Sequence, residues 1–232
     1  MWNGKKKAIT FSFDDGVTQD IRCIEILNKY GLKGTFNLNS GYFGLPHTDY
    51  VVNNHTITHN KVRACDVKKI YEGHEVAVHT LTHPNLTTLE DTTVIRQVEE
   101  DRKALSELCG YPVIGMAYPC GGVNNDERVA KLIKENTPIR YSRTITSTGT
   151  FELQKDNLHR FNPTLHYANP KLDEIVDEFL ALETEEPKLL YIWGHTYEMD
   201  AEVITWENFE KLCQKLAGRE DIFYGTNKEV LL

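Results

Sequence analysis

Short apolar segments alternate along the chain with segments in which apolar residues recur every three or four positions. The first pattern predicts strands and the second predicts amphipathic helices. The predicted strands cover 8–13, 34–38, 75–78, 113–117, 141–145, 189–193 and 222–224, and the predicted helices cover 18–30, 89–109, 126–135, 171–182 and 206–216. Gly31 and Gly110 follow the first two helices, at the position where glycine commonly ends a helix.

Strands that alternate with helices favour parallel pairing through right-handed crossovers. With about seven strands and no Rossmann glycine-rich turn, the pattern predicts an α/β fold, a single-domain distorted (β/α) barrel. The domain is expected to span residues 1–232, with its core at about 7–227. The segment 40–63 is polar, rich in histidine and weakly periodic, so we expect a long functional loop there.

Composition narrows the classes of function. A length of 232 residues fits one domain, and the formal charge of −8 argues against a nucleic-acid binder. No apolar run approaches the roughly 18 residues that span a bilayer, and no signal peptide is evident. The five cysteines form no C-x-x-C pair, which predicts free thiols and a reducing compartment. We therefore expect a cytoplasmic protein without nucleic-acid or membrane partners; its oligomeric state stays open.

Four polar clusters each follow a predicted strand: Asp14-Asp15-Gly16, His79–His83, Pro119–Gly122 and His195. In a β/α barrel the carboxyl ends of the strands converge on one face, where active sites are built. The sequence therefore predicts that these four clusters meet at one site.

Asp14 and Asp15 are adjacent carboxylates, which repel each other at the end of an apolar strand. The repulsion is relieved if one binds a cation and the other takes or shares a proton. Strand alternation points the two side chains in different directions, so we do not expect one ion to take both equally. Taken alone, Asp-Asp-Gly also fits a simple turn in which Gly16 supplies positive φ.

His79 and His83 have a spacing that suits two ligands of one metal ion. Pro84 disfavours helix at His83, so we expect a turn after a strand. Taken alone, the two could also be solvated loop histidines. Together with Asp15 they form a two-histidine, one-carboxylate set that leaves positions open for water and substrate.

A second H-x3-H pair, His55 and His59, has the same spacing and lies in the polar segment 53–60. Only weak strand character precedes it, whereas the alternating strand Glu75–Val78 leads into His79. His79 and His83 are therefore predicted to supply the ligands, and the pair His55 and His59 is set aside.

Four segments resemble motifs of the polysaccharide deacetylases (carbohydrate esterase family 4, the NodB-homology domain). Phe11–Gly16, F-S-F-D-D-G, resembles the first motif, T-F-D-D-G, and Gly73–Pro84 resembles the second, H-[ST]-x-x-H. Tyr118–Gly121 is similar to the third, R-x-P-Y-G, and Trp193–His195 to the fifth, L-x-H. The resemblance covers about 7–227, and its first two motifs are the specific ones.

The resemblance implies that Asp14 is the general base and His195 the general acid. It implies that Asp15, His79 and His83 bind one divalent ion, which we expect to be zinc, with cobalt, nickel or manganese as alternatives. The chemistry agrees, because such an ion activates water and polarises a carbonyl. A carboxylate can then take a proton, and an imidazole can protonate the leaving amine.

The later motifs imply groups that contact the substrate. The backbone N–H of Cys120, in the segment that contains Tyr118 and Pro119, would hold the oxyanion. Trp193 would line the pocket for the acetyl methyl group, although a tryptophan on an apolar strand also fits the core. A nucleophilic Cys120 is not favoured, because the sequence places no base beside it.

The chain departs from the family pattern at Ala117, where the third motif normally has an arginine that orients the base. Arg143, at the end of another predicted strand, is our hypothesis for its replacement. The fourth motif is unrecognisable around 141–144, so His195 has no assigned partner. Glu198 and Asp200 lie near it in sequence, but solvent exposure is the simpler expectation for them.

Two further expectations concern the surroundings. The charged run Glu99–Lys103 is expected to be a solvated helix face. His159 and His166 flank an extended, proline-containing stretch, and a place for one of them beside the substrate cleft is only the minor alternative. The loops 40–63 and 151–170 are expected to determine substrate selectivity.

The sequence is compatible with three functions. The leading one is metal-dependent hydrolysis of an N- or O-acetyl group on a sugar or oligosaccharide. The second keeps the fold and metal but cleaves another C–N bond, as in a small cyclic amide or ureide. The third is a non-catalytic carbohydrate-binding module.

Overall fold

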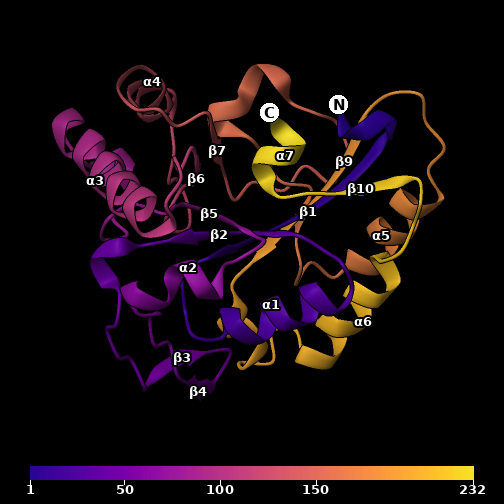
Figure 1. Ribbon diagram of the computed structural model, residues 1–232, viewed down its shortest axis with the longest axis horizontal. Coiled ribbons are helices and arrows are strands. Elements are labelled where there is room, and N and C mark those ends of the chain that lie inside the picture. The colour runs from indigo at the N-terminus through magenta and orange to yellow at the C-terminus, as the bar shows by residue number, and fades with distance from the viewer.

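The computed structural model describes residues 1–232 and places the predicted strands in one parallel sheet (Figure 1). The sheet order is β7-β6-β5-β2-β1-β9-β8, and β10 pairs with β1 outside this path. The strands are β1 (Lys7–Asp14), β2 (Gly34–Leu38), β5 (Glu75–Val78), β6 (Gly115–Ala117), β7 (Tyr141–Arg143), β8 (Leu165–His166), β9 (Lys188–Gly194) and β10 (Ile222–Tyr224).

Strand β1 is the centre of the sheet. It pairs with β9 along 7–13, with β2 along 11–14 and with β10 along 7–9, always in parallel. All eight of its residues are buried. Thr10 and Ser12 tolerate this burial because both take part in side-chain hydrogen bonds with Asn227. A parallel strand covered on both faces accounts for the nearly continuous apolar run in the sequence.

The sheet curls into a half-barrel, which confirms the predicted distorted barrel. β7 and β8 do not pair with each other, and the segment at Phe161 lies between them. Phe161 N–H donates to the Ser142 carbonyl at 2.9 Å, and Thr144 N–H donates to the Phe161 carbonyl at 2.8 Å. Three residues later, Thr164 N–H donates to the Tyr191 carbonyl at 2.9 Å on β9. An irregular segment, instead of a strand pair, therefore bridges this side.

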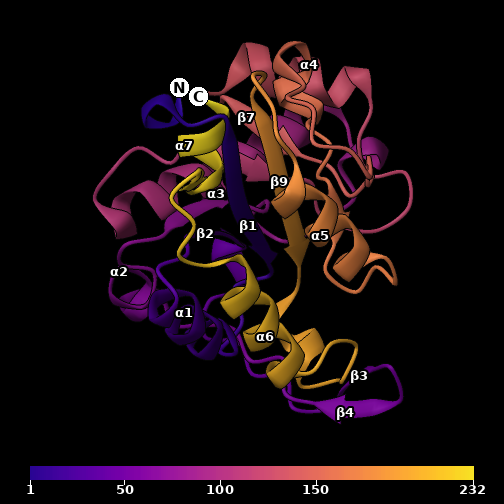
Figure 2. The ribbon, with the colours of Figure 1, turned by 90° about the vertical axis from the view of Figure 1, so that its right-hand side faces the viewer.

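Helices cover the outside of the sheet, and both chain ends lie close together in the two views (Figure 2). The helices are α1 (Asp20–Lys29), α2 (Val67–Ile70), α3 (Asp91–Cys109), α4 (Glu127–Asn136), α5 (Leu172–Ala181), α6 (Trp206–Leu216) and α7 (Asn227–Leu231). Trp2 Nε1 donates to the Val230 carbonyl at 3.1 Å and links the two ends. No helix combines the length and apolar character that crossing a membrane requires.

The segment 40–63 was predicted as a loop, but it contains an antiparallel hairpin, β3 (Tyr50–Val52) and β4 (His55–Ile57). The hairpin projects beyond α1 and α6 (Figure 2). Asn53 and Asn54 form its turn with φ of 50° and 61°. A two-residue hairpin turn of type I′ needs positive φ at both positions, which asparagine tolerates. This Asn-Asn signal was available in the sequence.

Candidate metal and catalytic site

A cavity of about 280 Å³ lies at the carboxyl ends of the strands. Most residues around it lie at or just after the carboxyl ends of β1, β5, β6, β7 and β9, as parallel pairing predicts, and Tyr50 comes from the segment 40–63. Those that the sequence singled out are Asp14, Asp15, His79, His83, Tyr118, Cys120, Trp193 and His195. Segments as far apart as residues 14 and 195 therefore form one site.

Asp15, His79 and His83 present their ligand atoms within 4.8 Å of one another. His83 Nε2 lies 3.4 Å from Asp15 Oδ1, and His79 Nε2 lies 3.8 Å from the same oxygen. Ligands of a tetrahedral zinc ion stand about 3.4 Å apart, so the set fits such an ion. The geometry leaves room for non-protein ligands, because only three side chains converge there.

The tautomer of His79 also fits a metal ligand. Its Nδ1 lies 2.9 Å from the Ala117 carbonyl, an acceptor, so Nδ1 carries the proton and Nε2 keeps its lone pair. Burial lowers the pKa of His79 to about 4, against the charges of Asp14 and Asp15, which raise it. The imidazole is therefore neutral and able to bind a cation at neutral pH.

The loop that carries both histidines is a turn, as Pro84 predicted, and not a helix. Thr80 and His83 have φ of 68° and 55°. Gln97 on α3 holds this loop, because its carbonyl accepts from Leu81 N–H at 2.9 Å and its side chain exchanges hydrogen bonds with Thr82. The unusual backbone that aims the imidazoles is thus supported from α3.

Arg143 contacts Asp14. Its Nη2 lies 2.5 Å from each carboxylate oxygen, and both side chains are buried. The Arg143 guanidinium also lies over the Trp193 ring, 4.5 Å from its centroid. Burial raises the pKa of Asp14, but Arg143, His79 and His195 outweigh it and lower the pKa below its ordinary value. Asp14 is therefore an ionised carboxylate.

Arg143 lies directly opposite Ala117 in the register of β6 and β7. Ala117 is the position at which the resemblance expects an arginine. The guanidinium in this chain thus comes from the neighbouring strand at the same level, which is the placement that the sequence hypothesis requires.

His195 lies next to Glu198, which follows it by one turn of a 3-10 helix, η6 (Thr196–Met199). His195 Nδ1 is 3.3 Å from Glu198 Oε1, and His195 N–H donates to Glu198 Oε2 at 3.2 Å. Burial lowers the pKa of His195, but Glu198, Asp15 and Asp14 outweigh it and raise the pKa to about 9. Glu198 is only 14% exposed in its side chain, so the expectation of a solvated Glu198 was wrong.

His166, His195 and Glu198 form a second group with metal-ligand spacing. Ala168 N–H donates to His166 Nδ1 at 3.1 Å, so the proton of this imidazole is on Nε2. That Nε2 lies 3.2 Å from Glu198 Oε2. Since a protonated nitrogen is not a ligand, we interpret this group as hydrogen bonding that orients Glu198.

Hydrogen bonds from the Asn124 side chain fix the backbone of the segment 118–122. Asn124 Nδ2 donates to the carbonyls of Pro119 and Cys120 at 3.0 and 2.7 Å. Cys120 has φ of 70°, and its N–H donates to no other group of the chain. Its thiol is directed to the His83 carbonyl at 3.4 Å. The Tyr118 hydroxyl donates to the His159 carbonyl at 2.7 Å, which directs it away from the ligand triad.

Neither His159 nor His166, for which a place beside the cleft was the minor alternative, lines the cavity. His166 lies behind it, with its ring 4.6 Å from that of Trp193. His159 is engaged elsewhere, 3.0 Å from the Ile139 carbonyl.

The prediction that Glu99–Lys103 forms a solvated helix face was wrong for Asp101, whose side chain is fully buried. Its carboxyl group accepts from Ser40 N–H at 2.7 Å and from His79 N–H at 3.2 Å. Burial raises the pKa of Asp101 to about 7. The sequence did carry a sign of this burial, because helical periodicity places Asp101 on the same face of the helix as Val98 and Leu105.

The structure separates the two members of the H-x3-H pair that was set aside. His55 is half-buried on β4, 4.0 Å from Glu202. His59 is buried, and its Nε2 lies 3.6 Å from Asp15 Oδ2. The pair does not bind one ion together, but the sequence interpretation missed that His59 reaches the site.

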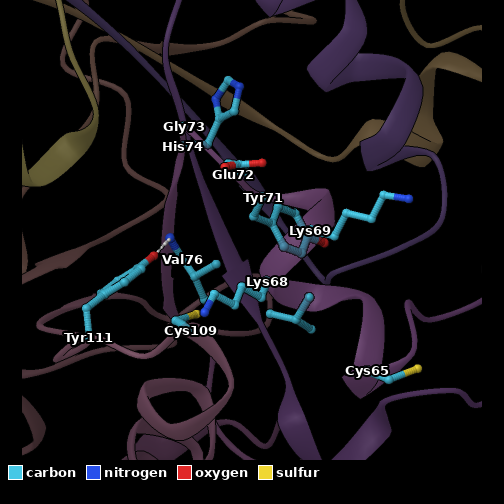
Figure 3. A pocket seen from close by; sticks show the side chains of 11 residues that line it. Cys65, Lys68, Lys69, Tyr71, Glu72, Gly73, His74, Val76, Cys109 and Tyr111 are labelled. Atoms are coloured by element: carbon cyan, nitrogen blue, oxygen red, sulfur yellow. Dashed lines mark hydrogen bonds between the residues drawn. The ribbon is translucent and has the colours of Figure 1, made fainter.

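A larger cavity, about 510 Å³, lies at the amino end of β5 (Figure 3). Its lining includes His74, Cys109 and Tyr111, whose hydroxyl accepts from Val76 N–H at 3.3 Å. None of the predicted site residues lines it. Size therefore does not identify the functional site in this protein.

Comparison with known proteins identifies relatives. The family model described as polysaccharide deacetylase matches residues 2–137. The chain is 25% identical over 177 residues to a chitooligosaccharide deacetylase of Rhizobium leguminosarum bv. trifolii, covering 75% of this chain and 66% of that protein. It is 27% identical over 120 residues to a peptidoglycan-N-acetylglucosamine deacetylase of Listeria monocytogenes, covering 51% of this chain. The chain matches only 22% of the length of this second relative.

Solved structures share the fold. The Xyl-CE4 domain of a multidomain xylanase from the hindgut metagenome of Trinervitermes trinervoides aligns with a TM-score of 0.58 at 16% identity. The alignment covers 98% of this chain and 90% of that one. Since the family model covers more than half of the sequence, this chain belongs to the polysaccharide deacetylase family.

Proposed function

We propose that this protein hydrolyses an N- or O-acetyl group on a carbohydrate, with one divalent ion bound by Asp15, His79 and His83. The observation that carries the proposal is that an ionised carboxylate, Asp14, and a protonated imidazole, His195, line the same cavity as the three ligands. A site that only binds sugar needs no base and acid placed together.

The bound ion would polarise the acetyl carbonyl and lower the pKa of water. Asp14, kept ionised by Arg143, takes the proton of the attacking water. His195, kept protonated by Glu198, gives its proton to the leaving nitrogen or oxygen. The free N–H of Cys120 donates to the oxyanion, and Trp193 lies beside the acetyl methyl group.

Zinc is the ion that we propose, with cobalt, nickel and manganese as alternatives, because two imidazoles and one carboxylate suit these metals. The names of the relatives indicate where to look for a substrate. One is called a chitooligosaccharide deacetylase, and the other a peptidoglycan-N-acetylglucosamine deacetylase. Acetylated chito-oligosaccharides are therefore the first substrates to test.

The test is acetate release from acetylated chito-oligosaccharides before and after metal removal with a chelator. We expect activity to disappear in metal-free protein and to return with Zn²⁺ or Co²⁺. Full activity in protein shown by elemental analysis to contain no metal would overturn the proposal.

The alternative of a small cyclic amide or ureide substrate drew on the missing arginine at position 117. The contact of Arg143 with Asp14 removes that reason. Parallel assays on small ureides distinguish the two substrate classes.

A further inference from the structure

We propose that His59 and Lys61, brought to the site by the β3–β4 hairpin segment, are positioning residues that orient Asp15 for metal binding. The inference rests on the proposed metal-dependent function. It assigns a role to His59, which belongs to the H-x3-H pair that was set aside. Three structural observations support this inference.

The first step is the attachment of the segment to the end of β1. Thr18 N–H donates to the Asn60 carbonyl at 2.9 Å, and Val62 N–H donates to the Gly16 carbonyl at 3.0 Å. Val17 and Lys61 form an antiparallel bridge between these two bonds. Residues 60–62 therefore lie along the chain that immediately follows Asp15. This pairing brings Lys61 and the preceding His59 close to Asp15.

The second step is the backbone of Asp15. Its φ is 84°, in the left-handed region, which is unfavourable for a residue with a side chain. Lys61 Nζ donates to the Asp15 carbonyl at 2.7 Å. The Lys61 side chain is only 9% exposed, so this bond is shielded from water. Lys61 thus stabilises the turn that aims the Asp15 side chain at the histidines.

The third step concerns the two oxygens of the Asp15 carboxylate. His79 and His83 approach Oδ1, and Lys61 Nζ lies 3.9 Å from the same oxygen. His59 Nε2 instead lies 3.6 Å from Oδ2. His59 Nε2 is buried and has no hydrogen-bond partner. A shift of about 0.4 Å brings this pair within hydrogen-bond range. His59 then holds Oδ2 and leaves Oδ1 directed to the ion.

The packing of His59 limits where its nitrogen can point. The ring centroid lies 4.4 Å from that of Tyr50 and 4.7 Å from that of Tyr197. His59 has no nitrogen in the group of ligand atoms from Asp15, His79 and His83 that lie within 4.8 Å of one another. His59 therefore acts through Asp15 and not as a fourth ligand. Partners of this kind commonly change metal affinity 10–100-fold when they are replaced.

The experiment titrates metal-free protein with Zn²⁺ in competition with a chromophoric chelator. We expect His59→Phe, which keeps an aromatic ring but no nitrogen, to raise the Kd for Zn²⁺ about 10–100-fold. His55→Phe is the matched control, because it changes the half-buried member of the same pair, which lies beside Glu202 and not Asp15, and it should leave the Kd unchanged. His59→Gln restores an N–H donor and should recover part of the affinity, whereas Lys61→Met should lose affinity like His59→Phe.

Thermal melting of the metal-free variants checks that each variant is folded. If His59→Phe does not fold, His59→Gln and Lys61→Met take its place in the test. A Kd within twofold of wild type in folded His59→Phe and Lys61→Met would overturn the inference while leaving the proposed function standing. Wild-type protein that binds no Zn²⁺ and works without it would instead refute the proposed function.

Discussion

Arg143 and Asp14 form a buried ion pair between strands that are not neighbours. Arg143 ends β7, Asp14 ends β1, and β6, β5 and β2 separate them in the sheet. The Arg143 Nη2 nevertheless lies 2.5 Å from both Asp14 oxygens. The curl of the sheet brings the two strand ends together, so this contact depends on the barrel-like shape and not on neighbouring positions in the sheet.

Arg143→Ala should reduce kcat/KM by at least tenfold, because it removes the cation that keeps Asp14 ionised and oriented. Loss of one partner of a buried ion pair should also lower the free energy of unfolding by about 3–5 kcal/mol. Urea unfolding and acetate-release kinetics measure the two effects. Arg128→Ala, which breaks an exposed pair with Asp91, is the control and should cost about 0–1 kcal/mol. A kcat/KM within twofold of wild type in Arg143→Ala would remove the assigned role.

Asp14→Asn should bind Zn²⁺ with nearly the affinity of the wild-type protein and lose turnover by about 10²–10⁴-fold, because the amide cannot take a proton. Zinc titration and acetate release on the same preparation give both quantities. If turnover persisted, Asp14 would not be the base; if zinc binding were also lost, Asp14 would belong to the ligand set.

Glu198→Gln should move the alkaline limb of the rate profile to lower pH. With the pKa of His195 raised to about 9, the acid stays protonated and the rate falls only as pH rises through about 9. Asp14, Asp15 and Glu198 raise this pKa, so removing the Glu198 charge should lower it toward 6.5.

Asp200→Asn is the control for that profile, because Asp200 contacts Gln19 and Trp206 instead of His195. The same raised pKa contributes stability that is complete below about pH 6.5 and is lost as pH rises through about 9. An unchanged alkaline limb in Glu198→Gln would show that Glu198 does not set the pKa of His195.

Asp101→Asn should destabilise the fold by about 1–3 kcal/mol and weaken zinc binding, because the two buried N–H groups donate to different carboxylate oxygens and the amide replaces one of these oxygens with an NH2 donor. Those donors belong to Ser40 and His79, so the change reaches the ligand loop through its backbone. Glu100→Gln, on the exposed side of α3, is the matched control. Equal melting temperatures for Asp101→Asn and the wild type would contradict this role.

Much of the fold was available from the sequence because it depends on local pattern. The expected strands at 34–38, 75–78 and 222–224 and the expected helix at 206–216 match β2, β5, β10 and α6 residue for residue. The hairpin at 50–57 was missed because its two strands are short and weakly alternating. The two-residue strand β8 was missed because pairing with β9, and not its own letters, makes it a strand.

Asp14, Asp15, His79, His83 and His195 could be placed in one site from the sequence because they lie at or shortly after the ends of apolar strands, and parallel strands bring such positions to one face. Their proposed roles as base, ligands and acid came from the family resemblance. Their partners could not be assigned in the same way. Glu198 beside His195, Asp101 beneath His79 and His59 against Asp15 all depend on how the polypeptide packs in three dimensions. Strand order and periodicity are local properties that the letters carry, whereas the charge partner of a buried group is decided by which elements the curled sheet places next to it.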